Sequence, residues 1–233
     1  MHLFHCPDLS GQTVELPEEE AHHAASVLRL AAGDTIGLLD GLGTRVTATL
    51  LEVGRKRVLA NVTARERSPV ERPFRIHLAV APTKQADRFE WFVEKAVEIG
   101  VDRITPLATA RTERTKLRRD RLERVAISAM KQSQRSWLPR IDELTDMKEL
   151  LASDLPPQRF FGWCEGEHAP LMQRYSTAAD AVVLIGPEGD FTAAEAGILR
   201  AHQFQATSLG TARLRTETAA LAACTWMSLA QQR

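Results

Sequence analysis

The sequence predicts an α/β protein in which a small β-barrel domain precedes a larger domain built on a parallel sheet. Residues 1–67 hold short apolar or β-branched runs separated by turn signals, a pattern typical of a small barrel. From residue 74 onward, apolar runs alternate with amphipathic stretches of helical spacing, which indicates a parallel sheet covered by helices on both faces. A polar segment with two prolines at 66–73 separates the two patterns. We therefore expect one domain at 1–67 and a second at 74–233.

In the first domain we expect three strands and one helix. The strands fall at 35–39, 44–53 and 57–64, and a turn rich in glycine, Asp40-Gly41-Leu42-Gly43, joins the first two. A helix is expected between 16 and 30, because Pro17 suits the first turn and three glutamates at 18–20 favour the positive end of the helix dipole.

In the second domain the expected strands are 76–80, 104–107, 159–163, 181–185 and 206–209. The expected helices are 87–99, 117–135, 147–153, 192–202 and 217–231. Parallel sheets of this kind bind ligands in the loops beyond the carboxyl ends of their strands. These loops are therefore where we look for a functional site.

Composition and length exclude several classes of protein. The chain has 233 residues, 44% hydrophobic and 26% charged, which is typical of a folded globular protein and not of a disordered one. No apolar run approaches the ~18 residues of a membrane span, and the first residues lack the pattern of a secretory signal. Three scattered cysteines form no CxxC pair, and the adjacent His22 and His23 point to different faces of a helix, so we expect no metal and a cytoplasmic protein.

Charge is concentrated in one segment although the chain as a whole is neutral. Residues 111–140 hold ten basic and three acidic residues, a net charge of +7, against 30 basic and 30 acidic residues in the whole chain. A concentrated field of one sign suits a polyanion such as a nucleic acid. The alternative is a solvated helix face with a basic bias.

The loop after the 181–185 strand carries the first chemical signal. Neither GxGxxG nor GxxxxGK[ST] occurs in the chain, so the common nucleotide signatures are absent. Gly186 and Gly189 allow close backbone approach, and Pro187 stiffens the turn between them. Thr192 and Glu195 form a capping box that starts the next helix. Glu188 lies between the glycines, where an acid has no packing role.

A second loop of the same kind runs from Leu209 into the last helix. Gly210 marks its turn, and Arg213, Arg215 and Glu217 place alternating charges where a ligand is expected. Glu217 also complements the dipole of the helix that it opens, so a purely structural role suits that residue as well.

Together these segments resemble the RsmE family of ribosomal RNA uridine N3 methyltransferases, within the SPOUT superfamily. IGPEGDFT and LGTARLRTETAA are similar to the two signature loops of the superfamily. The stretch from His23 to Arg29 resembles the N-terminal PUA-like barrel, and segments from Lys84 to Val101 and from Gln132 to Arg135 resemble the rest of the family pattern. The chain departs from that pattern at Asp190, where a second glycine is common, at Lys131, where glutamate is common, and at 212–214.

The resemblance implies a fold, a cofactor and partners. It implies a C-terminal deep trefoil knot that holds S-adenosylmethionine, a homodimer with active sites at the subunit interface, and methylation of a uridine in 16S rRNA within the small ribosomal subunit. Cofactor contacts are expected from Leu184, Ile185, Gly186, Pro187, Glu188, Gly189, Leu209, Gly210, Leu214, Thr216 and Thr218. RNA contacts are expected from Arg29, Arg111, Arg114, Arg118, Arg121, Arg124 and Arg135, with the PUA-like domain also binding RNA.

Catalysis by such a site needs alignment of the methyl donor and removal of the proton on the uracil nitrogen. Arg215 is expected to stabilise negative charge on the uracil carbonyl oxygens. Glu217 or Glu188 is expected to accept the proton or to orient Arg215, and a basic residue of the partner subunit is an alternative. Two other functions stay open: methylation of ribose 2'-hydroxyls, and non-catalytic RNA binding in ribosome assembly.

Overall fold

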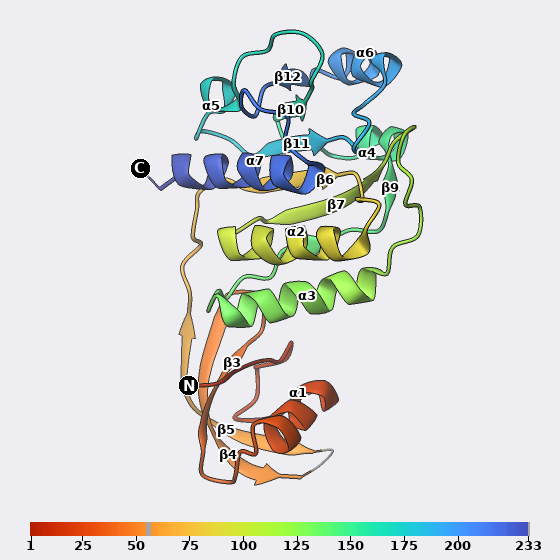
Figure 1. Ribbon diagram of the computed structural model, residues 1–233. Coiled ribbons are helices and arrows are strands. Elements are labelled where there is room, and N and C mark those ends of the chain that lie inside the picture. Colours follow the sequence, from red (N-terminus) through yellow and green to blue (C-terminus); the bar gives the residue numbers. More distant parts are fainter. Residues whose placement is uncertain (55–56, 233) are drawn as a thin grey trace. The chain divides into compact units, whose positions relative to one another are not determined.

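The computed structural model describes residues 1–54 and 57–232 and divides the chain into two compact units (Figure 1). The first unit combines Met1–Glu71 with Ile127–Leu138, and the second combines Arg72–Ala126 with Pro139–Arg233. The segment Ile127–Leu138 falls within the range that the sequence assigned to the second domain. The division falls inside one continuous helix, between Ala126 and Ile127. The apolar spacing of a helix does not show which unit each of its turns packs against.

A five-stranded sheet forms the first unit, in the order β1-β3-β4-β5-β2. β1 pairs with β3 in parallel and the other neighbours are antiparallel. The three predicted strands are confirmed, whereas β1 and β2 have three residues each and were not predicted. The bounds are β1 Leu3–His5, β2 Thr13–Glu15, β3 Thr35–Leu39, β4 Thr44–Val53 and β5 Val58–Arg67.

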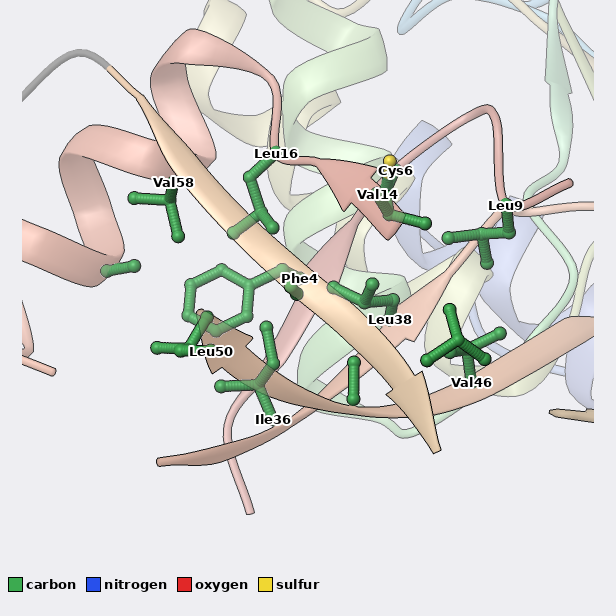
Figure 2. Close-up of a cluster of buried hydrophobic side chains, with 14 of the residues drawn as sticks. Phe4, Cys6, Leu9, Val14, Leu16, Ile36, Leu38, Val46, Leu50 and Val58 are labelled. Atoms are coloured by element: carbon green, nitrogen blue, oxygen red, sulfur yellow. The ribbon is translucent and has the colours of Figure 1, made fainter. Parts of the chain in front are cut away.

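The core of the first unit gathers around Phe4, which is fully buried. Figure 2 shows Ile36 of β3 and Leu50 of β4 beside this ring, in a core cluster to which β2 and β5 also contribute aliphatic side chains. The departure at Lys131 has a structural reason, because its ammonium lies 2.6 Å from the carboxylate of the buried Glu20 within the same unit.

The helix predicted between 16 and 30 is confirmed in place but changes form along its length. α1 (Glu18–His22) is followed by a π-helix, η1 (His23–Val27), in which the N–H of Leu28 donates to the carbonyl of His23. Arg29, one of the expected RNA contacts, follows with a left-handed φ of 55° and an exposed side chain.

A parallel sheet of seven strands forms the second unit, in the order β12-β10-β11-β6-β7-β8, with β9 also pairing with β7. All five predicted strands are confirmed within one or two residues. The bounds are β6 Ile76–Val80, β7 Arg103–Ala108, β8 Arg140–Ile141, β9 Thr145–Asp146, β10 Gln158–Gly162, β11 Ala181–Ile185 and β12 Gln205–Thr207.

Helices cover both faces of this sheet. Figure 1 shows α2 and α7 side by side, and α7 packs on β6 and β11. On the opposite face Leu150 of α4 and Leu199 of α6 share a core cluster with Val182 and Leu184 of β11. None of the helices in the described residues is long and apolar enough to cross a membrane. The bounds are α2 Ala86–Ile99, α3 Arg119–Gln132, α4 Met147–Ala152, α5 Leu171–Arg174, α6 Ala193–Ala201 and α7 Thr216–Ala230.

Arg72 is the first residue of the second unit, and its hydrogen bonds connect the beginning of that unit to α7 at its end. The buried guanidinium donates to the carbonyl of Gly100, to the carboxylate of Asp102 at 2.8 Å and to the hydroxyl of Ser228 in α7 at 3.1 Å. Ser228 in turn donates to the carbonyl of Ile99 at 3.2 Å. A buried charge is stable only with such partners, so this junction depends on α7 being in place.

A second buried polar group, the His77 imidazole, lies in β6. Its Nε2 lies 2.8 Å from the Thr105 hydroxyl, which donates to the Asp142 carboxylate at 2.5 Å. Arg103 and Arg140 each donate to the same carboxylate at 2.6 Å. Because the Thr105 hydrogen goes to Asp142, His77 must donate through Nε2. Burial, followed by the charge of Arg103, lowers the pKa of His77 to about 3.

This shifted pKa predicts a loss of stability in mild acid. The unfolded chain protonates His77 below about pH 6.5, whereas the folded protein keeps it neutral down to about pH 3. Protons therefore favour the unfolded state in that window, and the free energy of unfolding should fall by about 2 kcal/mol between pH 7 and pH 5 from this group. Urea unfolding at both pH values measures it. His77→Gln keeps a donor for Thr105 but does not titrate, so an equally steep loss in this variant would contradict the assignment.

Candidate active site

The loop after β11 packs tightly against Gly186, its first residue. A Cβ at Gly186 would lie 3.1 Å from the backbone nitrogen of Phe191 and 3.2 Å from the carbonyl carbon of Asp190. The loop therefore folds back on its own first residue. The expected capping box is confirmed, since the Glu195 N–H donates to the Thr192 hydroxyl at 3.1 Å and the Thr192 N–H donates to the Glu195 carboxylate at 2.7 Å.

Asp190 replaces the common second glycine without loss of the turn. Its φ is 62°, in the left-handed region that favours glycine, and aspartate is one of the few other residues that adopt it. Its carboxylate accepts from the N–H of Phe191 at 2.8 Å and from the N–H of Cys164 at 2.9 Å. These hydrogen bonds fix the strained residue in place.

The second loop meets the first at the carboxyl edge of the sheet. The Thr216 hydroxyl donates to the carbonyl of Gly186 at 3.1 Å, and the Arg213 guanidinium donates to the carbonyl of Glu188 at 3.4 Å. Two loops far apart in sequence, one after β11 and one after β12, are thereby joined at two points. Gly210 has a φ of 138° and no atom within 4 Å of where a Cβ would stand, so the loop is open at this position.

The expected cofactor contacts separate into backbone and side-chain groups. Leu184 and Ile185 are buried in the sheet, so only their backbone faces the loop. Leu209 and Leu214 are half-buried. A Cβ at Gly162, the end of β10, would lie 3.3 Å from Ile185 and 3.4 Å from Leu209, so three neighbouring strands end at one place. Of the other expected contacts, Pro187 and Thr216 are buried, and Glu188, Gly189 and Thr218 are exposed.

Among the candidate catalytic residues, Arg215 and Glu188 are exposed and Glu217 is buried. Arg215 stands at the N-cap position of α7, directly before Thr216. Glu188 accepts the backbone N–H of Lys84 at 3.3 Å. The Glu217 carboxylate lies 4.0 Å from the guanidinium of Arg88, in α2. Arg88 was not among the residues predicted from the sequence, because the helix expected at 87–99 was interpreted only as a core helix. The charge of Arg88 beside the apolar face of this helix was the signal that could have identified it.

The basic segment divides into two parts with different surroundings. Arg118 and Arg124 pair with Asp120 at 2.6 and 2.9 Å, and Arg121 pairs with Glu90 at 2.6 Å, all near the surface. Arg111 instead donates to the carbonyls of Gly189 and Phe191 in the loop after β11. Arg114 donates to the carbonyl of Lys84, whose N–H donates to Glu188 of that loop. Arg135 pairs with Glu71 in the first unit.

The family of the chain follows from comparison with known proteins. Residues 70–228 match the RNA methyltransferase domain family, and residues 16–63 match the RNA methyltransferase PUA domain family. Ribosomal RNA small subunit methyltransferase E of Synechocystis sp. is 30% identical over 89% of this chain and 70% of its own length. The chain belongs to the RsmE family. The Bacillus subtilis protein of the same name is 27% identical over 93% of this chain and 90% of its own length.

Solved structures similar to this chain support its place in the RsmE family over its full length. The RsmE of Neisseria gonorrhoeae bound to S-adenosyl methionine has a TM-score of 0.88 and 30% identity, covering 98% of this chain and 97% of its own. A probable rRNA-methyltransferase from Porphyromonas gingivalis has a TM-score of 0.91 and 38% identity, covering 100% of this chain and 99% of its own. The expected α/β fold, with a parallel sheet and an N-terminal PUA domain, is thereby confirmed.

Proposed function

We propose that this RsmE-family protein transfers a methyl group from S-adenosylmethionine to N3 of a uridine in 16S rRNA. The observation that carries the proposal is the junction of the two loops through Thr216 with Gly186 and Arg213 with Glu188. It gathers an open loop, an exposed guanidinium and two carboxylates at the carboxyl edge of a parallel sheet, where such folds bind ligands. The names of the relatives support small-subunit rRNA as the substrate.

The loops fit an adenosyl cofactor. Half-buried Leu209 and Leu214 offer apolar contact for a base, and the open position at Gly210 leaves room beside them. Backbone groups at 184–189 offer hydrogen bonds that need no side chain. S-adenosylmethionine supplies an electrophilic methyl group and requires no metal. The residues that would hold it are Leu184, Ile185, Gly186, Pro187, Glu188, Gly189, Leu209, Gly210, Leu214, Thr216 and Thr218.

The charged residues suit the acid–base work of the reaction. Uracil N3 is a poor nucleophile until it loses its proton, so a nearby base and a cation both favour reaction. Arg215 is exposed at the start of α7 and stabilises charge on the uracil oxygens in this proposal. The exposed Glu188 suits the base, whereas the buried Glu217, beside Arg88, suits a role in orienting charge.

The proposal includes the wider properties that the family resemblance implies. These are the trefoil knot, a PUA-like RNA-binding domain at 1–67 before a methyltransferase domain at 74–233, a homodimer and a cytoplasmic location. In a knotted fold these two loops would lie together at the cofactor site, and the contact of Thr216, the first residue of α7, with Gly186 is in keeping with that arrangement. Exposed apolar side chains on the adjacent α2 and α7, Trp91 and Leu229, support the homodimer.

RNA binding is expected to involve Arg118, Arg121 and Arg124. Replacing all three with glutamine should weaken RNA binding and reduce the slope of log K against log salt by about 0.7 to 0.9 for each lost phosphate contact. Glutamine is preferable to charge reversal, because each arginine contacts an acid. Filter binding across a salt series measures the slope, and cofactor affinity should not change. An unchanged slope would show that these arginines form only a solvated surface.

Mass spectrometry of rRNA tests the proposed function. Nucleosides from a strain that lacks the gene should lose one N3-methyluridine from 16S rRNA, and the purified protein should restore it with S-adenosylmethionine. Loss of a 2'-O-methyl nucleoside would favour ribose methylation instead. No missing methyl group, together with altered subunit assembly, would favour a non-catalytic role.

A further inference from the structure

We propose that Arg111 and Glu195 are positioning residues that hold the cofactor loop in its binding conformation, with Arg111 serving the cofactor site and not RNA phosphate. The inference rests on the proposed function for the identity of the ligand, but the loop contacts are independent of it. Arg111 lies in the turn between β7 and α3, 78 residues before Gly189.

Arg111 contacts the loop through both its stem and its guanidinium. One terminal nitrogen, Nη1, donates to the carbonyl of Gly189 at 2.5 Å and to that of Phe191 at 3.3 Å. The stem carbon Cδ would lie 3.2 Å from a Cβ at position 189, so the side chain packs directly over the glycine. One charged group therefore spans the end of the loop, and hydrogen bonds from a charged donor are stronger than neutral ones.

Glu195 makes a second connection between the same two segments. Its Oε1 accepts the backbone N–H of Ala110 at 2.8 Å, while Oε2 accepts both the N–H and the hydroxyl of Thr192. Glu195 is only 7% exposed, so these hydrogen bonds are protected from water. The capping glutamate thus ties the start of α6 to the turn that carries Arg111.

The turn itself is stiffened by its own hydrogen bonds. Thr109 and Thr112 are linked through the Thr109 N–H to the Thr112 hydroxyl at 2.9 Å and through the Thr112 N–H to the Thr109 carbonyl at 3.1 Å. A rigid turn with two connections, one to Gly189 and Phe191 and one to Glu195, restrains the loop along residues 189–195. A preorganised loop binds its ligand more tightly because less conformational freedom is lost on binding.

Hydrogen exchange of the loop amides tests this directly, in the full-length protein without ligand. Arg111→Ala should speed exchange of the hydrogen-bonded amides of Asp190 and Phe191 by tenfold or more. Arg111→Lys should recover part of the protection, because a single ammonium does not reproduce the guanidinium fork. Glu195→Gln should also speed exchange. Arg75→Ala, which removes an exposed arginine elsewhere in the same unit, should change nothing. Unchanged exchange in Arg111→Ala would overturn the proposal.

Calorimetry and kinetics give the second readout. Arg111→Ala should weaken S-adenosylmethionine binding by tenfold or more and raise its KM, while kcat at saturation and the salt slope of RNA binding stay near those of the wild type. An unchanged cofactor affinity with a lower salt slope would instead make Arg111 a phosphate contact and overturn the inference. If the wild-type protein bound no S-adenosylmethionine, the proposed function would fail while the exchange result still decided the role of Arg111.

Discussion

Replacing Arg215 with alanine is expected to lower the single-turnover rate of methylation by roughly a hundredfold or more, the scale seen when one oxyanion donor is lost. The guanidinium is exposed at the N-cap position of α7, next to the Thr216 that contacts the cofactor loop. If it stabilises charge that develops on uracil, affinities for cofactor and RNA should change little, because the interaction forms mostly in the transition state. Rapid-quench assays at saturating concentrations of both substrates measure the rate.

Two further variants separate this role from simple binding. Arg215→Lys should recover only part of the rate, since an ammonium lacks the planar fork of donors. Arg213→Ala removes a neighbouring arginine that donates to the Glu188 carbonyl, and should act mainly on cofactor affinity. A near-normal saturated rate in Arg215→Ala with weaker binding would make Arg215 a positioning residue, and Arg213 would be tested next for the charge-stabilising role.

Gly186→Val is expected to weaken S-adenosylmethionine binding by about ten- to a hundredfold, because crowding of this kind costs about 1 to 3 kcal/mol. The new Cβ would meet the backbone of Asp190 and Phe191 at 3.1 to 3.2 Å, and backbone does not yield as a flexible side chain does. The loop must move, and the carbonyl that accepts the Thr216 hydroxyl moves with it. Titration calorimetry measures the affinity, with circular dichroism as a check on folding.

Gly197→Ala is the matched control for this change. Gly197 lies inside α6, where an added Cβ meets no atom within 4 Å. Alanine should therefore leave cofactor binding unchanged and raise the free energy of unfolding by about 0.5 to 1 kcal/mol, because glycine is the poorer helix former. Equal cofactor affinities in Gly186→Val and the wild type would place the cofactor away from this loop.

Elements with a strong local pattern were predicted at or near their observed bounds. β11 is one case, because all five of its residues are apolar, buried and followed directly by Gly186. β8 and β9 have two residues each and are defined by their pairing with β7. Two residues are too few to show a strand periodicity, so these strands could not be predicted. The π-helical form of η1 was not predicted either, because apolar spacing does not show which backbone hydrogen bonds a helix forms.

The loops of the candidate site could be predicted, but the residues that support them could not. Glycine after a buried strand is a local signal, and it located both loops. Arg111 carries only a positive charge in the sequence, and a positive charge predicts a polyanion as readily as a backbone carbonyl 78 residues away. Arg88 was missed in the same way, because its neighbour Glu217 comes from the last helix.

The buried guanidinium of Arg72 has a consequence for how the chain is made. Its partner Ser228 lies 156 residues later, and at the usual pace of translation of roughly 5 to 20 residues per second that separation takes about 8 to 30 s. Until Ser228 is made, the Arg72 guanidinium lacks one of its three partners, and the sheet lacks the helix that covers β6 and β11. The second unit thus closes after translation of its final turns, and a ribosome that stalls before Ser228 leaves an apolar sheet face open to chaperones.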